Sequence, residues 1–243
     1  MPSPTAAIML VGNEILSGRT QDANIRFIAE RLAARGVRLS EVRVIRDEEQ
    51  AIIKTARELS RAYDLVFSTG GIGPTHDDIT AESLSKALGT PLEINVEAKR
   101  RLEEYYRAKG SDVNEGRMRM ARIPKGAALI DNPVSVAPGF RLENVYVMAG
   151  VPKIMQGMFL NIEPELPQGT PLLSRTIRAA LREGDIAIEL EKIQKAFPDV
   201  EIGSYPAMDG EKPDLSLVLR AEDEKRLEEA AAHVQTLADK SAL

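Results

Sequence analysis

One stretch of the chain, TGGIGPTHDDIT at residues 69–80, combines glycines, hydroxyl groups and carboxylates in a pattern that could bind phosphate. Glycines permit positive φ and let backbone amides approach a phosphate closely. The stretch leads into a predicted helix, whose amino terminus adds partial positive charge. It is neither a Walker loop nor a dinucleotide fingerprint, because no lysine follows the last glycine. We predict that six of its residues bind the ligand: Gly70, Gly71, Gly73, Pro74, Thr75 and Thr80.

Two adjacent carboxylates, Asp77 and Asp78, lie at the end of this glycine-rich loop. They would repel a bound phosphate unless a divalent cation lay between them. Glu14 follows the first predicted strand, whose end should lie on the same edge of a parallel sheet as the loop. We therefore predict that Glu14, Asp77 and Asp78 bind a divalent metal, with Mg²⁺ as the expected cofactor. The alternative is structural, with an aspartate that caps the helix and a plain turn at Glu14.

Other side chains offer less chemistry. The chain has no cysteine, which excludes thiolate zinc sites and a cysteine nucleophile. Its two histidines, His76 and His233, cannot form a His-rich metal site or a Ser-His-Asp triad. Asp47, Asn132 and Ser135 follow other predicted strands, and each taken alone is more typical of a turn or a cap.

The elements that must position these residues alternate between strand and helix. Apolar runs predict strands at 6–11, 37–45 and 64–69, and helical spacing predicts helices around 25–36, 48–62 and 79–88. Such alternation implies an α/β fold with a mostly parallel sheet covered by helices on both faces. Ligands bind to such sheets at the carboxyl ends of the strands.

The middle of the chain is mixed. Residues 96–109 read as a polar helix with a solvated Arg- and Glu-rich face, to which we assign no chemistry. Three short strands are predicted next, at 128–130, 134–140 and 145–148, before a helix in which methionines fill the core.

A domain boundary is predicted near residues 163–171, where three prolines and a glycine interrupt the pattern. The remainder reads as a β-α-β-β-α module of about seventy residues, a small α+β domain. We therefore assign residues 1–168 to the main domain and residues 169–243 to the small one.

The amino-acid composition limits the classes of partner that we expect. A net charge of -5, five Phe, five Tyr and no Trp give neither the basic stripe nor the stacking platform of a nucleic-acid binder. No apolar run is long enough for a signal peptide core or a membrane span, so we expect no membrane partner and a cytoplasmic location. The expected partners are a small-molecule ligand and further copies of the chain, in a homo-oligomer of two or three subunits.

Five motifs resemble, in the same order, the amino-terminal part of the competence/damage-inducible protein A (CinA) family: residues 12–18, 22–24, 69–80, 132–140 and 150–155. The main domain of that family has the molybdopterin-binding fold of the molybdenum-cofactor enzymes. The resemblance implies a three-layer αβα sandwich with the ligand under the glycine-rich loop. It also implies catalytic roles for Asp47 and Asp78. From its place at the end of the first strand we add Glu14 as a catalytic candidate, and within the later motifs we expect ligand contacts from Asn132, Ser135 and Gly150.

The resemblance also suggests a reaction. CinA-like proteins are associated with divalent-metal-dependent cleavage of the pyrophosphate in ADP-ribose, often alongside a carboxyl-terminal nicotinamide-nucleotide deamidase domain. No such deamidase is found in these 243 residues, so deamidation is not expected of them. Asn13 departs from the Thr or Asp usual before the motif's glutamate. Three functions stay open: a pyrophosphohydrolase of ADP-ribose or a related nucleotide, a protein that binds molybdopterin or a nucleotide without cleaving it, and a molybdopterin adenylyltransferase.

Overall fold

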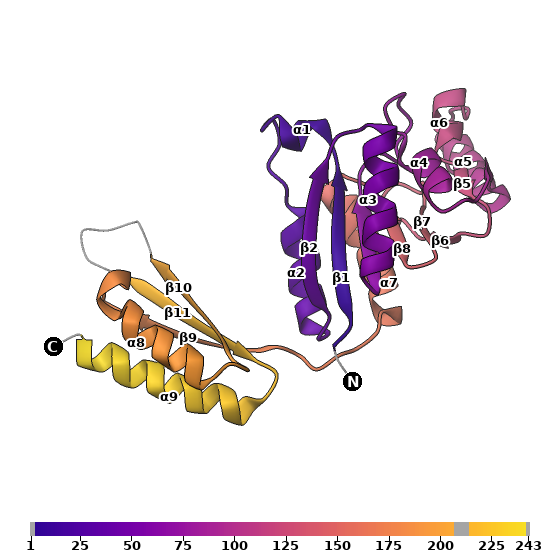
Figure 1. Ribbon diagram of the computed structural model, residues 1–243. Coiled ribbons are helices and arrows are strands. Elements are labelled where there is room, and N and C mark those ends of the chain that lie inside the picture. Colours follow the sequence, from indigo (N-terminus) through magenta and orange to yellow (C-terminus); the bar gives the residue numbers. More distant parts are fainter. Residues whose placement is uncertain (1–2, 207–213, 242–243) are drawn as a thin grey trace. The chain divides into compact units, whose positions relative to one another are not determined.

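The structure is a computed structural model that describes residues 3–206 and 214–241 (Figure 1). The chain forms two compact units, Met1–Gly169 and Thr170–Leu243. The sequence placed the boundary one residue earlier, in the same proline-rich stretch.

A six-stranded sheet forms the centre of the first unit. Its strands lie in the order β2 (Arg38–Ile45), β1 (Thr5–Val11), β3 (Leu65–Thr69), β8 (Val145–Met148), β7 (Gly139–Leu142) and β6 (Ala128–Ile130). The first four strands are parallel to one another, and β7 and β6 continue the sheet antiparallel. The predicted α/β class with a mostly parallel sheet is confirmed.

Helices cover both faces of this sheet. Successive residues of β1 point to opposite faces, as in any strand, so Ala7 and Met9 belong to one apolar cluster while Ala6 and Ile8 belong to the other. The first cluster packs against α3 (Glu49–Ala62), α4 (Thr80–Ala87) and α5 (Val96–Ala108). The second packs against α2 (Asn24–Ala34) and α7 (Pro152–Ile162), which continues into a 3-10 turn at Glu163–Glu165. The unit therefore has three layers, as predicted.

Thr5 and Asp64 join the starts of β1 and β3 at the edge of the sheet where these strands begin. The Thr5 amide and hydroxyl both donate to Asp64 Oδ2, each at 2.8 Å. These two hydrogen bonds hold the pKa of the Asp64 carboxyl below its ordinary value of 3.8, and the bond from the amide contributes more than the bond from the hydroxyl.

An insertion between α4 and β6 contains elements that the sequence did not predict. Two short strands, β4 (Leu92–Ile94) and β5 (Arg122–Pro124), pair antiparallel, and α6 (Glu115–Arg119) follows α5. The predicted solvated face of α5 carries ion pairs between its own residues, among them Arg100 with Glu97 and Glu104.

The predicted strand at 134–140 is wrong for most of its length, because β7 begins only at Gly139. The side chain of Asn132 folds the preceding residues into a turn. Its Oδ1 accepts hydrogen bonds from the amides of Val134 and Ser135, and its Nδ2 donates to Ser135 Oγ and the Ala137 carbonyl. Val136 has a φ of 66°, which no strand allows.

The second unit follows the predicted order of elements: β9 (Leu173–Ala179), α8 (Glu183–Ala196), β10 (Glu201–Pro206), β11 (Leu215–Ala221) and α9 (Glu224–Ser241). Its three strands are antiparallel in the order β10-β11-β9. Alternate residues of β11 are buried in one core with residues of both helices. Across the parts of both units that the structure describes, no helix is long and apolar enough to cross a membrane.

Candidate functional site

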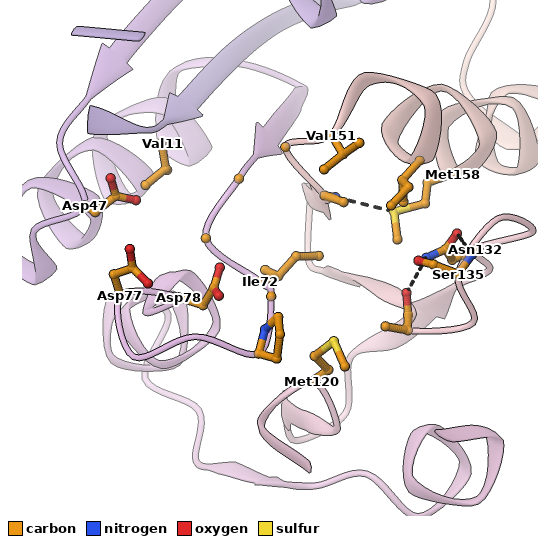
Figure 2. A pocket seen from close by; sticks show the side chains of 18 of the residues that line it. Val11, Asp47, Ile72, Asp77, Asp78, Met120, Asn132, Ser135, Val151 and Met158 are labelled. Carbon is orange, nitrogen blue, oxygen red and sulfur yellow. Dashed lines mark hydrogen bonds between the residues drawn. The ribbon is translucent and has the colours of Figure 1, made fainter. Parts of the chain in front are cut away.

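A pocket of about 400 Å³ opens at the carboxyl ends of the parallel strands of the first unit. Val11 comes from the end of β1, Asp47 from the turn after β2, Gly70 from the loop after β3 and Gly150 from the loop after β8. Parallel α/β sheets bind ligands at this edge. The pocket therefore lies at the edge of the sheet where the sequence predicts the ligand site (Figure 2).

The glycine-rich loop folds tightly against its surroundings. Gly70 and Gly71 have φ values of 100° and 68°, the left-handed region that favours glycine. A Cβ at Gly70 would lie 2.2 Å from the Val11 carbonyl oxygen, and one at Gly71 would lie 2.1 Å from Thr80 Oγ1. The buried Thr80 holds both glycines, since its hydroxyl donates to the Gly70 carbonyl and its amide to the Gly71 carbonyl, each at 3.0 Å.

The backbone amides of this loop are available to a ligand. Within the described residues, the amides of Gly71, Ile72 and Gly73 donate to no protein acceptor. All three residues line the pocket. Unpaired backbone amides in a loop that lines a cavity can donate to an anion, as in other anion-binding loops.

Four carboxylates line the same pocket, from Glu14, Asp47, Asp77 and Asp78. Asp47 Oδ2 accepts a hydrogen bond of 2.8 Å from the Asn13 amide, at the start of α1 (Asn13–Leu16), which carries Glu14. The side chain of Asn13 is not needed for this contact, so its departure from the family pattern leaves the contact intact.

The loop itself restrains the two aspartates at its end. Asp78 Oδ2 accepts hydrogen bonds from the Thr75 amide, at 2.8 Å, and from the Thr75 hydroxyl. The same hydroxyl, together with the Asp77 amide, lowers the pKa of the Asp77 carboxyl below its ordinary 3.8. Asp77 is therefore ionised at neutral pH. The residue that caps the amino terminus of α4 is Ile79, so neither Asp77 nor Asp78 caps this helix.

The fit of these carboxylates to a metal depends on what else binds. Among the residues that the structure describes, no three His, Cys, Asp or Glu side chains are grouped closely enough to hold a metal ion. Glu14, Asp77 and Asp78 line one pocket without forming such a group. Mg²⁺ is commonly held by one or two carboxylates together with the phosphates of a ligand. This donor set fits a cation that enters with a phosphorylated ligand, and not a cage made by the protein alone.

The other side of the pocket is apolar with a polar corner. Figure 2 shows Asp47, Asp77 and Asp78 on one side of Ile72, and Asn132, Ser135 and Met158 on the other. The larger apolar residues of this lining include Ile72, Met120, Val151, Ile154 and Met158. Pockets that bind small molecules commonly combine apolar walls with a few placed polar groups.

Gly150 brings the loop after β8 against the glycine-rich loop. A Cβ on Gly150 would lie 3.3 Å from the α-carbon of Gly70, so the loops after β3 and β8 pack backbone against backbone. The side chain of Asn24, buried at the start of α2, donates to the Gly150 carbonyl at 2.8 Å. The sequence singled out Asn24 within a motif, but gave it no role.

Most of the site residues predicted from the sequence converge on this pocket. Two do not line it, because Thr75 binds Asp78 and Thr80 supports the glycines from behind. The apolar residues that line the pocket were not predicted as site residues from the sequence. The methionines at positions 120 and 158 had no signal that separated them from core residues, and Met158 is in fact buried, with its sulfur accepting from the Ala149 amide.

Comparisons with known proteins agree with this architecture. Residues 7–168 match the family described as "Probable molybdopterin binding domain", and residues 171–243 match "FAD synthase, middle domain". A protein of Pyrobaculum arsenaticum is 37% identical over 210 residues, which cover 83% of this chain and 79% of that protein. A protein of Archaeoglobus fulgidus is 33% identical over 231 residues, which cover 95% of this chain and 96% of that protein.

A solved structure shows the same relationship. The crystal structure of CinA from Thermoplasma acidophilum matches with a TM-score of 0.63 at 35% identity, and covers 68% of this chain and 99% of that one. The resemblance to CinA is therefore confirmed in sequence and in structure. With a family match over 7–168 and relatives that are similar along most of its length, the chain belongs to the family of probable molybdopterin-binding domains.

Proposed function

We propose that the pocket binds a phosphorylated nucleotide or pterin, with the phosphates on the glycine-rich loop and the ring in the apolar half. The observation that carries this proposal is the run of three backbone amides, from Gly71 to Gly73, that have no protein acceptor in the described residues and line the pocket. The apolar side, with the Asn132 and Ser135 corner, suits a flat ring that carries hydrogen-bonding edges.

The reaction we propose is divalent-metal-dependent cleavage of the pyrophosphate in ADP-ribose or a related nucleotide. In the described residues Asp78 accepts hydrogen bonds only through Oδ2, so its Oδ1 has no protein donor. Asp47 is held by the Asn13 amide, and Glu14 lies on the same short helix as that amide. When bound, a divalent cation would neutralise the phosphates and lower the pKa of a coordinated water. Asp78 is the carboxylate that we expect to matter most.

The first experiment measures ADP-ribose hydrolysis, with and without Mg²⁺, by wild type and by Asp78→Asn. The asparagine retains an oxygen that can accept from Thr75, so the loop should stay folded while the negative charge is lost. We expect Asp78→Asn to reduce turnover by about 100-fold or more, a loss typical of removing one electrostatic contributor at a reaction centre. Asp185→Asn, which makes the same charge change on α8 of the second unit, should leave turnover unchanged.

A second candidate function is binding without cleavage. It is favoured by the lack, among described residues, of a preformed group of three metal-binding side chains. Calorimetry with ADP-ribose, AMP and molybdopterin distinguishes the candidates, since tight binding without product would favour the binding protein. Turnover that requires both ATP and the pterin would instead identify an adenylyltransferase. If wild type neither binds nor cleaves any of these compounds, the proposed function is wrong.

A further inference from the structure

The pocket described above contains strong negative charge and no compensating side chain. Its lining includes four carboxylates, and among the described residues it includes no Lys, Arg or His. A diphosphate placed there would face like charges on one wall. Backbone amides and a cation reduce this repulsion, but a fixed positive side chain beside the loop would reduce it further.

A small chamber lined in part by the glycine-rich loop has such side chains in its lining. It has a volume of about 20 Å³ and shares Gly71, Ile72, Gly73, Asp78 and Met120 with the main pocket. Its remaining lining includes two arginines, Arg119 and Arg122. A space of this size holds about one water molecule or one oxygen atom. It can therefore receive a peripheral phosphate oxygen, while the phosphorus atom stays in the larger pocket.

Of the two arginines, Arg119 is placed to act on the loop. Its Nη1 donates to the Thr75 carbonyl at 3.1 Å, which brings the guanidinium beside the loop. Within residues 3–206 and 214–241 it forms no ion pair, so its charge is not neutralised by a carboxylate. Arg122 differs, because its Nη2 lies 3.6 Å from Glu82 Oε2.

The backbone that carries Arg119 is also held against the loop. The α-carbon of Gly116, in α6, packs so closely on the Pro74 carbonyl that an added Cβ would lie 3.2 Å from its oxygen. Directly after α6, Ala121 is buried in the core of the unit. The guanidinium is thus delivered to the loop by a segment with fixed contacts on both sides.

We propose that Arg119 is a phosphate-binding residue, which donates from the chamber to an oxygen of a diphosphate whose other oxygens bind the amides of Gly71, Ile72 and Gly73. An arginine can keep its bond to the Thr75 carbonyl and still offer further N–H groups, since its fork carries five donors. This inference deepens the proposed function and rests on it, because it assigns a residue to the phosphates of that ligand.

The test uses inorganic pyrophosphate with excess Mg²⁺ as the probe, so that the result does not depend on the base, the sugar or the pterin. Binding is measured by calorimetry for wild type, Arg119→Gln and Arg119→Lys. Glutamine keeps a polar N–H group but has no charge, whereas lysine keeps the charge. We expect Arg119→Gln to weaken binding about 10- to 100-fold and Arg119→Lys to weaken it less, as expected for a charge-assisted hydrogen bond.

The matched control is Arg61→Gln, an exposed arginine in the last turn of α3 at the opposite edge of the sheet, which should bind pyrophosphate as wild type does. If Arg119 only supports the loop, glutamine and lysine will behave alike, and that result overturns the inference. Unchanged binding by Arg119→Gln, or no binding by wild type, overturns it as well. The proposed function fails separately, when ADP-ribose and the other nucleotides and pterin are neither bound nor cleaved.

Discussion

Substitution of Gly71 by alanine is expected to destabilise the first unit more than the same substitution at Gly18. Both glycines have a left-handed φ, 68° at Gly71 and 71° at Gly18. A Cβ at Gly18 would meet nothing within 4 Å, whereas one at Gly71 would lie 2.1 Å from the hydroxyl of the buried Thr80. Gly18→Ala therefore isolates the conformational cost, and Gly71→Ala adds the steric cost.

The magnitudes follow from these contacts. The left-handed conformation costs alanine about 1 kcal/mol relative to glycine. At Gly71 the clash displaces the Thr80 hydroxyl from the Gly70 carbonyl, and an unsatisfied buried acceptor costs about 1–3 kcal/mol more. We expect destabilisation of about 2–4 kcal/mol for Gly71→Ala and about 1 kcal/mol for Gly18→Ala. Thr80→Ala removes the clashing atom, so the double variant should be more stable than the two single changes predict by addition.

Urea unfolding followed by tyrosine fluorescence measures these differences. Four of the five tyrosines, at positions 63, 105, 106 and 146, lie in the first unit, so the signal reports mainly on that unit. Equal losses of stability at Gly71 and Gly18 would refute the steric argument. Strict additivity of Gly71→Ala and Thr80→Ala would show that the clash is relieved by some other movement.

Three further outcomes are expected. Asn132→Asp replaces the two donors to Ser135 and Ala137 by an oxygen, so it should cost about 1–3 kcal/mol and speed amide hydrogen exchange at 134–137. Asp64 has a folded pKa below 3.8, so its stabilising contribution is complete above that pH and is lost as the pH falls through the folded value. Urea midpoints measured between about pH 2 and 6 should therefore depend less on pH in Asp64→Asn. A chain that ends at Gly169 should keep the ligand affinity of the full chain, since every residue that lines the pocket precedes it. Light scattering on the same fragment tests whether the second unit mediates the predicted homo-oligomer.

Apolar periodicity was sufficient to predict the sheet and the helices around it. Runs such as 6–11 and 65–69 are buried on both faces, which leaves a strong hydrophobic signal. The same order of elements predicted that Glu14 would lie at the edge of the glycine-rich loop, because the ends of parallel strands share one edge. The role of Asp47 came only from the resemblance to the CinA family. The tight glycines could also be anticipated, since few other residues adopt positive φ.

The segments that were not predicted correctly depend on contacts that apolar periodicity does not reveal. The apolar residues at 134–140 resemble a strand, but the side-chain hydrogen bonds of Asn132 override that pattern, and a single sequence does not reveal them. The short pair β4 and β5 depends on contacts between residues thirty positions apart, with only three residues in each strand. Arg119 lies in a segment to which the sequence assigned no element and no role, and only the folded insertion brings it to Thr75.

The backbone contact between Gly70 and Gly150 bears on how fast a ligand can enter and leave. The loops after β3 and β8 pack closely where Gly150 faces the α-carbon of Gly70, and the Asn24 side chain donates to the Gly150 carbonyl, so the two loops support each other. A pocket with such walls exists before the ligand arrives, and binding then needs little rearrangement of the backbone. Association should accordingly proceed in one kinetic phase whose rate rises linearly with ligand concentration, limited by encounter and by the removal of water from the phosphates.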